Sequence, residues 1–418
     1  MVEEEGGGGP TSFSPAEERP KGSLFEVFLA TLKLGVTSFG GPIAHLGNFH
    51  EEYVVRRKWI DEQGYADAVA YANSLPGATS SQVGIIMGTH RAGLLGGLVA
   101  WIGFTMPSAL IMIAFGLAAL SSSFTNASWL HGLKIAAVVI VAQAVWGMAQ
   151  RLAPDKDRAS IAIGAAIASL AVAGIAIGQF AIIIVAGFVG WVVLRHLPIQ
   201  SGRISIAARI PRWLSLASLG LFFGLLIIVP LLKEVIPNNQ ALAVFYAFYS
   251  SGALVFGGGH VVLPLLNAQV VTPGWVTSSQ FLSGYGFTQA MPGPIFTFSA
   301  YLGTILIQPP NGLVGGFFAL FSIFLPSFLL VYGPLPFWNE LRKKKSFQSV
   351  LNGINAAVVG ILLAALYNPI FIGAIMYPAD FALAIGLGAL LMIWKRPPWN
   401  IVLVAAIGGL LIGYFVPF

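Results

Sequence analysis

The stretch Thr37-Ser38-Phe39-Gly40-Gly41-Pro42 is followed by Leu75-Pro76-Gly77, then Gly96-Gly97, then Pro107. The same order returns in the second half as Leu254-Val255-Phe256-Gly257-Gly258-Gly259-His260, Met291-Pro292-Gly293-Pro294, Gly315-Gly316 and Pro326. Partners stay 216 to 219 residues apart. Proline removes a backbone donor and glycine relaxes the backbone, so each motif can break a helix. In an apolar chain, duplicated helix breaks are typical of a transporter built from two repeats.

The composition places nearly the whole chain in a membrane. Of its 418 residues, 56% are hydrophobic and 9% are charged, whereas soluble domains carry about 25% charged residues. The net charge of +6 is explained by basic loops on the cytoplasmic side, so no nucleic-acid partner is expected. The absence of cysteine excludes disulfides and thiolate metal sites. The sequence has no P-loop and no HExxH, so we expect no ATP, metal or cofactor, and any uphill transport would use an ion gradient or exchange.

Apolar segments long enough to cross a bilayer, about 20 residues each, predict an all-α polytopic membrane protein. We count about 13 transmembrane segments, within a range of 10–13, and some are interrupted by Gly and Pro. The segments are 24–44, 64–90, 93–119, 129–150, 159–177, 179–195, 213–232, 242–264, 279–306, 312–332, 348–370, 379–394 and 399–417.

The charges in the loops between these segments predict the orientation. Loops on one side hold 16 Lys and Arg residues, and loops on the other side hold 4. The positive-inside rule then puts the N-terminus in the cytoplasm and the C-terminus outside, in a multi-pass protein of the cell membrane. The loop 45–63 is an exception, because three basic residues there accompany four acidic ones on the side expected to be outside.

The order of segments predicts four regions. Residues 1–22 are acidic and glycine-rich and lack the features of a signal peptide, so we expect a disordered tail. Residues 23–196 form the first repeat, 197–240 a cytoplasmic linker with one lone transmembrane segment, and 241–418 the second repeat. The lone crossing makes the second repeat enter from the opposite side, which predicts inverted topology.

The breaks are candidate anion sites. Exposed amides cannot face lipid, so a broken helix belongs inside protein or beside a water-filled cavity. Its new N-terminus offers free N–H groups and a partial positive charge. A single break would equally serve as a kink, and nearby hydroxyls would equally bond between helices, but matched breaks in both halves favour a site. The polar residues that follow the breaks are Ser74, Thr79, Ser80, Ser81, Gln82, Gln289, Thr297 and Ser299.

Ionisable residues near the motifs are further candidates. His45 and His260 follow the glycine motifs and would bind an anion or carry a proton, unless they are polar anchors at the membrane interface. Lys33, Asp67 and Arg91 are candidates for ion coupling or anion steering, although a helix-end arginine usually marks only topology.

Longer motifs around these residues give the chain a family resemblance. They include Ser38 to Gly47, Ser80-Ser81-Gln82-Val83-Gly84, Phe256 to Leu266 and Gln289 to Gly303. From about residue 24 onward, the chain resembles the chromate ion transporter family in its long, two-repeat form. It departs from the family pattern at Ala78, where a second proline is usual, and at Gly47-Asn48-Phe49, where Gly-Tyr-Phe is usual. Neither departure removes the backbone break.

The resemblance implies a secondary active transporter that exports chromate, a tetrahedral dianion, across the cytoplasmic membrane and so confers chromate resistance. Sulfate or another oxyanion remains an alternative cargo, and a proton or a counter-anion an alternative coupling ion. A passive channel is a further alternative, and a membrane-embedded hydrolase is disfavoured by the absence of GxSxG and HExxH. The lipid bilayer and a second copy of the chain, as a homodimer, complete the expected partners.

One repeat is expected to rock against the other around a site where the breaks meet. The residues expected to bind the anion are Phe39, Gly40, Gly41, Pro42, His45, Pro76, Gly77, Ser80, Ser81, Gln82, Phe256, Gly257, Gly258, Gly259, His260, Gln289, Pro292, Gly293, Pro294 and Thr297.

Overall fold

The computed structural model describes residues 22–121, 127–172, 176–197 and 210–415. In these ranges every regular element is a helix, which confirms the all-α class. All but the last residue of the expected tail 1–22, and most of the expected linker before the lone segment, lie outside the described residues. The lone segment itself is α9 (Arg212–Val235).

The first half comprises α1 (Leu24–Thr37), α2 (Gly41–His50), the π-helix η1 (Glu51–Arg56), α3 (Glu62–Ser74), α4 (Thr79–Ala118), α6 (Trp129–Leu152), α7 (Lys156–Ala171), α8 (Ala176–Val193) and η2 (Leu194–His196). The second half comprises α10 (Gln240–Ala253), η3 (Gly259–Val261), α11 (Val262–Leu266), η4 (Asn267–Val271), α12 (Ser278–Thr288), η5 (Ile295–Thr297), α13 (Phe298–Thr304), α14 (Gly312–Tyr332), η6 (Leu335–Phe337), α15 (Trp338–Leu341), α16 (Lys345–Ala365), η7 (Leu366–Phe371), α17 (Ile372–Ala374), α18 (Pro378–Met392) and α19 (Pro398–Phe415).

Among the described residues, 7 helical stretches are long and apolar enough to cross a membrane, fewer than the expected 13. The difference comes mainly from the segments that carry the breaks. α1 has 14 residues, about 21 Å at about 1.5 Å per residue, which is too short for a hydrocarbon core of about 30 Å. The expected segment 24–44 is therefore not one straight crossing.

The chain after the first break returns to the end from which α1 started. Lys33 Nζ of α1 donates to Glu52 Oε2 of η1 at 2.6 Å, and Trp59 Nε1 donates to Glu26 Oε1 at 2.9 Å. α1, α2 and η1 thus form a hairpin whose apex is the break at 38–40.

A second hairpin follows the same course. α3 leads to the break at 75–78, and the first part of α4 leads back to Arg91, which donates to Glu26 Oε2 at 3.1 Å. Beyond Arg91, α4 is kinked where Ala92 and Gly93 leave helical geometry, and the rest of α4 runs on as a long apolar helix. The expectation for the loop 45–63 is corrected here, because the contacts of Glu26 put this loop at the same end of the molecule as Arg91.

The second half repeats this pattern. α10 leads to a break at 254–258, and η3, α11 and η4 lead back along it. α12 leads to a break at 289–294, and η5 and α13 lead back, so that the Ile307 N–H donates to the Trp275 carbonyl at 3.3 Å. In both halves the pair of hairpins precedes a long helix that packs against the first hairpin helix: α4 against α1, and α14 against α10.

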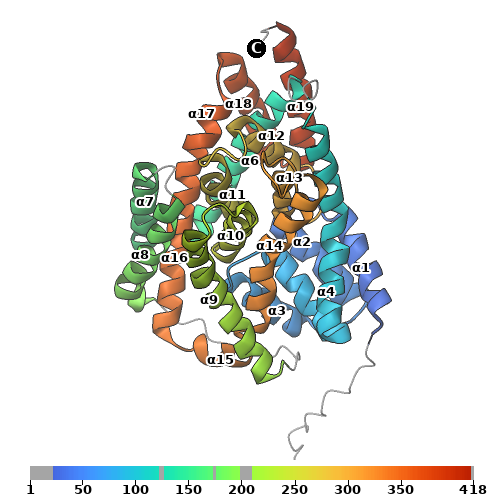
Figure 1. Ribbon diagram of the computed structural model, residues 1–418, viewed down its shortest axis with the longest axis vertical. Coiled ribbons are helices and arrows are strands. Elements are labelled where there is room, and N and C mark those ends of the chain that lie inside the picture. Colours follow the sequence, from blue (N-terminus) through green and yellow to red (C-terminus); the bar gives the residue numbers. More distant parts are fainter. Residues whose placement is uncertain (1–21, 122–126, 173–175, 198–209, 416–418) are drawn as a thin grey trace, which may run out of the picture.

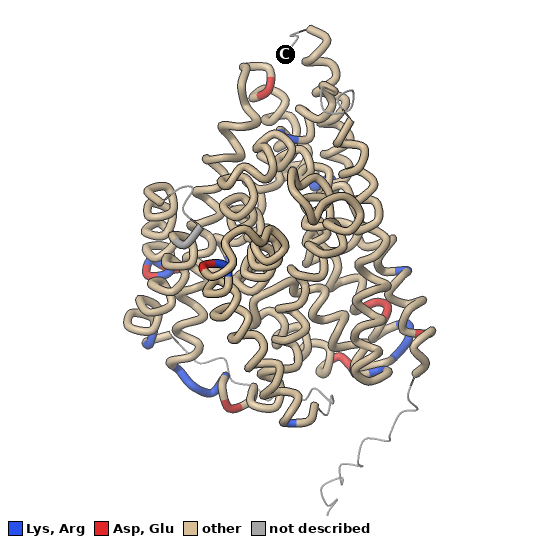
Figure 2. The backbone as a smooth tube through the Cα atoms, in the orientation of Figure 1, with Lys and Arg blue, Asp and Glu red and all other residues tan. Residues whose placement is uncertain are grey.

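The two halves exchange their last helices. α7 and α8 of the first half pack against α16 of the second, and α18 and α19 of the second half pack against α6 of the first. Figure 1 shows α7 and α8 beside α16 at one edge, α1 and α4 at the other edge, and α10 to α14 between them. Charged residues gather mainly toward the lower part of the same view, as Figure 2 shows.

Candidate functional site

The four breaks meet in pairs across the two halves. The Gly77 N–H donates to the Val255 carbonyl at 2.7 Å, and the Gly293 N–H donates to the Ser38 carbonyl at 2.9 Å. Each bond therefore joins the second break of one half to the first break of the other. The structure brings together the loops that the sequence analysis expected to meet.

Close packing explains why glycine occupies both donor positions. Gly77 has φ +125° and Gly293 has φ +86°, which is backbone geometry that favours glycine. A Cβ atom at Gly77 would lie 2.6 Å from Ser327 Oγ, and one at Gly293 would lie 2.8 Å from Ser108 Oγ. Ser108 and Ser327 directly follow Pro107 and Pro326, which are partners in the repeat. The two serines that pack against Gly293 and Gly77 are therefore duplicated as well.

Two helices begin at the breaks of the first half without a side-chain cap. α2 starts after Gly40, which is left-handed at φ 95°, and has proline in its first turn. α4 starts after Ala78. Because the first N–H groups of a helix lack partners within it, both starts contribute donors and partial positive charge near the breaks.

Among the described residues, half of the buried side-chain polar atoms without a hydrogen-bond partner lie around the breaks. Most buried polar groups in proteins are hydrogen-bonded, so such atoms point to a missing ligand or water. Those around the breaks are Ser38 Oγ, His45 Nε2, Ser81 Oγ and Gln82 Oε1 in the first half, and Gln289 Nε2 and Asn355 Oδ1 in the second half. Hydroxyl and amide donors among them suit an oxyanion.

The two histidines have different partners. His45 is 1% exposed and its Nδ1 lies 3.2 Å from Ser80 Oγ, while its Nε2 has no partner. His260 Nδ1 lies 2.7 Å from the hydroxyl of Tyr285. His45 is therefore joined to a residue expected in the site, whereas His260 is held by an aromatic residue that the sequence analysis did not single out.

Other residues that were expected in the site contact the backbone of the breaks or form part of it. Gln82 Nε2 donates to the Pro76 carbonyl at 2.8 Å, and Thr297 Oγ1 donates to the Pro294 carbonyl at 2.9 Å. Pro292 is buried in the fourth break, and Phe39 is 37% exposed beside the first. The third break contains Phe256, Gly257 and Gly258, and Gly259 is the first residue of η3.

The three candidates for ion coupling or anion steering do not join the breaks. Lys33 and Arg91 belong to the ion-pair cluster at the base of the first two hairpins, which we define as Glu26, Lys33, Glu52, Arg57 and Arg91. Asp67 is buried on α3 and accepts from Gln63 Nε2 at 3.0 Å.

Glu52 holds this ion-pair cluster together outside the membrane-length helices. Its side chain is 3% exposed and accepts from Lys33 Nζ and Arg57 Nε, each at 2.6 Å. Burial acts to raise the pKa of Glu52, but the hydrogen bonds and charges of Lys33 and Arg57 outweigh it and hold that pKa below its ordinary value. The corresponding turn of the second half, η4, contains no charged residue.

Sequence reasoning missed Ser108, Ser327, Tyr285 and Asn355 as neighbours of the breaks. For the two serines a signal existed, because each follows a proline that the sequence analysis had already paired. For Tyr285 and Asn355, nothing in the sequence indicates which break their helices pass.

The chain matches known proteins along most of its length. A family model described as chromate transporter matches residues 25–191 and again 242–410. The chain is similar to a probable chromate transport protein of Synechococcus elongatus (28% identity, covering 94% of this chain and 96% of the relative) and to a chromate transport protein of Pseudomonas aeruginosa (27%, 94% and 92%). It is also similar to an uncharacterized transporter of Methanocaldococcus jannaschii (25%, 96% and 96%). No solved structure matches the chain.

Proposed function

The chain belongs to the chromate transporter family, and from this premise we propose that it exports chromate from the cytoplasm by secondary active transport. The matched model covers each half separately, and relatives named as chromate transport proteins align over nearly the whole chain. Chromate transport is thus the function of the family, while the direction of transport and its coupling to an ion are our proposals.

One observation supports the breaks as the binding site more than any other. The reciprocal bonds from Gly77 to Val255 and from Gly293 to Ser38 bring breaks from both halves together inside a membrane-embedded body. Helix starts and unpartnered buried polar atoms surround them. A dianion bound there would receive donors from backbone and side chains, without a metal or a buried basic residue.

We further propose an orientation for the chain. If the ion-pair cluster faces the cytoplasm, the first two hairpins enter from the cytoplasm and the last two from outside, so that their apices meet within the membrane. Lys58 and its two basic neighbours then join the cytoplasmic majority of charges, which removes the exception in the charge pattern. The N-terminus stays inside and the C-terminus outside.

The exchange of helices suggests which part moves. Because α7 and α8 pack on α16, and α18 and α19 pack on α6, rocking one whole repeat against the other would break both interfaces. We therefore propose that the hairpin pairs, together with the long helices α4 and α14 on which they pack, move against α6, α16 and the helices exchanged onto them, which would expose the breaks first to one side and then to the other.

Flux into inside-out membrane vesicles tests the proposal, because export then becomes uptake. We expect labelled chromate to accumulate under a proton gradient or against trapped sulfate. No uptake under either condition would refute chromate transport, and uptake that never exceeds the external concentration would indicate a channel.

Sulfate or another oxyanion is the second candidate cargo, since chromate and sulfate share a tetrahedral dianionic shape. Competition separates the two cargoes. Unlabelled sulfate in excess should leave most of the chromate uptake in place if chromate is preferred, and should abolish that uptake if sulfate binds more tightly.

A further inference from the structure

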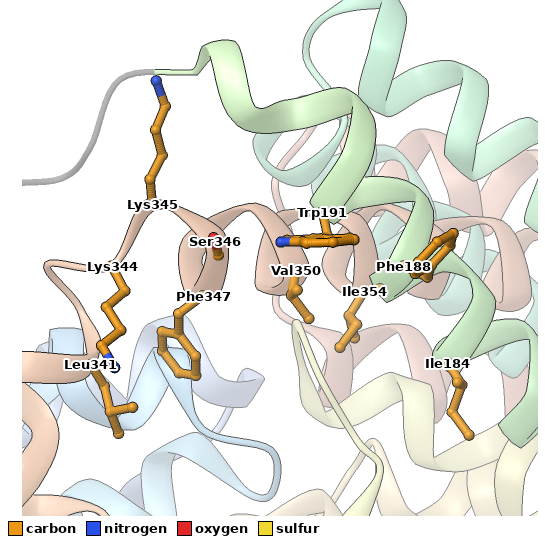
Figure 3. A pocket seen from close by; sticks show the side chains of 11 residues that line it. Ile184, Phe188, Trp191, Leu341, Lys344, Lys345, Ser346, Phe347, Val350 and Ile354 are labelled. Atoms are coloured by element: carbon orange, nitrogen blue, oxygen red, sulfur yellow. The ribbon is translucent and has the colours of Figure 1, made fainter.

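A groove lies on the outer side of α8 and α16, away from the breaks. It is an open groove of about 860 Å³, lined by Ile184, Phe188 and Trp191 of α8 together with Val350 and Ile354 of α16. Figure 3 shows the aromatic and aliphatic side chains of α8 opposite those of α16. Its volume lies within the range of about 300–1,000 Å³ that is usual for ligand pockets.

The groove is polar at one end and apolar along its length. Lys344, Lys345 and Ser346 lie where α16 begins, and Ile354 lies nine residues further along, about 13 Å deeper at about 1.5 Å per residue. On α8, Trp191 lies near the same end, and Ile184, which is 72% exposed, lies about two turns deeper. Since α8 belongs to a membrane-length apolar stretch, the deep end faces hydrocarbon.

The polar end carries only positive charge. Lys344 and Lys345 are exposed, and no carboxylate is among the described residues that line the groove. Arg195 stacks over Trp191 with its guanidinium carbon 4.3 Å from the ring centroid, which adds a cation near this end. α16 begins without a side-chain cap, so its first amides also favour an anion.

We propose that this groove binds an anionic phospholipid. The phosphate would lie at the start of α16 beside Lys344 and Lys345, whose side chains extend in different directions in Figure 3, and an acyl chain would lie along Phe188, Val350 and Ile354. Charge complementarity favours an anionic headgroup over a zwitterionic one. The apolar depth favours a lipid over a free phosphate, which would leave the deep end of the groove empty.

The groove lies at the contact between α8 and α16, so a bound lipid would affect how these two helices pack. Below its floor α8 and α16 touch through glycine: a Cβ atom at Gly190 would lie 2.6 Å from the Gly353 Cα. α8 belongs to the first half and α16 to the second, so a lipid in the groove would stabilise one of the two exchanged interfaces.

Thermal unfolding of the full-length purified protein tests the proposal, with added phosphatidylglycerol, phosphatidylcholine or glycerol phosphate. Phosphatidylglycerol should raise the melting temperature, and the other two should not, because a ligand that binds only the folded state stabilises it by mass action. In K344Q/K345Q the rise should fall to about half or less. Native mass spectrometry should show one fewer retained phosphatidylglycerol in this variant.

R342Q/K343Q is the matched control, since it removes the same charge from neighbouring residues that do not line the groove. It should respond like the wild type, and K344R/K345R should restore the response. An equal loss in R342Q/K343Q, or an equal shift with phosphatidylcholine, would overturn the proposal. A full shift with glycerol phosphate would mean that the basic end binds free phosphate without a lipid, and would overturn it as well.

Discussion

Gly293 donates its backbone N–H to the carbonyl of Ser38 at 2.9 Å, so a residue of the second half completes the backbone of a helix break in the first. In the reciprocal bond, the Gly77 N–H of the first half donates to the Val255 carbonyl of the second half at 2.7 Å. A hydrogen bond of this kind contributes about 1 kcal/mol net, but leaving a buried carbonyl unpaired inside a membrane costs more. The two bonds therefore fix the relative position of the four breaks.

Gly293→Ala should abolish transport and destabilise the protein. The new Cβ would meet Ser108 Oγ at 2.8 Å and the Phe104 carbonyl at 3.2 Å, and φ +86° is unfavourable for alanine. Chromate flux and thermal unfolding measure the two effects. Gly164→Ala is the control, because a Cβ atom there has no neighbour within 4 Å. If Gly293→Ala transports normally, the breaks do not need their close packing.

Gly258→Leu and Pro292→Leu should also abolish transport while the protein still reaches the membrane. Gly258 has φ +151°, which leucine rarely adopts, and Pro292 is buried in the fourth break. Flux is compared at equal amounts of membrane-inserted protein. Normal flux in both variants would exclude the broken helices as the transport site.

Gln289→Met should separate binding from stability. Gln289 Nε2 is buried without a partner, so replacing the amide with an apolar side chain of similar size should leave the melting temperature unchanged or raise it. The KM for chromate should rise, because a donor to the anion is lost. In the control Ser322→Ala, a hydroxyl that donates to the Phe318 carbonyl is removed away from the breaks, and KM should not change. An unchanged KM in Gln289→Met would remove Gln289 from the site.

The absence of cysteine makes the orientation of the hairpins measurable. Single cysteines at Glu51, Thr272 and Lys343, all exposed, can be labelled with a reagent that does not cross the membrane. We expect Glu51→Cys to be labelled from the same side as Lys343→Cys, and Thr272→Cys from the opposite side. Labelling of Glu51→Cys from the side opposite to Lys343→Cys would restore a full crossing between residues 24 and 50.

Glu52→Gln should lower stability at neutral pH. The pKa of Glu52 is held below its ordinary value of 4.5, so the stability contributed by its charged form is present above pH 4.5 and is lost as the pH falls through the lowered pKa. We expect a loss on the order of 1 to 3 kcal/mol at pH 7, and a smaller difference from the wild type at acid pH. Thermal unfolding across this pH range measures the difference.

The control for Glu52 is Glu340→Gln, since Glu340 is an exposed carboxylate at the end of α15. It should leave the melting temperature unchanged at every pH. A Glu52→Gln curve that stays parallel to the wild type down to strongly acid pH would show that the charge of Glu52 does not hold the hairpins.

Sequence alone was sufficient for the helical class, the two repeats and the positions of the breaks, because glycine and proline act on their own backbone. Sequence alone could not distinguish a helical hairpin that returns to the same side of the membrane from a helix that crosses it, since both are apolar segments of similar total length. The distinction rests on contacts such as Lys33 with Glu52, between residues on separate elements. For the same reason sequence alone left Lys33 and Arg91 as candidates for ion coupling or anion steering, whereas in the structure they pair with Glu52 and Glu26 at the hairpin base.

The reciprocal bonding of the breaks has a consequence for biosynthesis. While the ribosome is still making the second half, Gly77 has no Val255 and Ser38 has no Gly293, so the first half must be held with unpaired backbone at both apices. We therefore expect that neither half finishes folding alone. We expect the first half expressed by itself to be degraded, and the two halves expressed together as separate chains to protect each other.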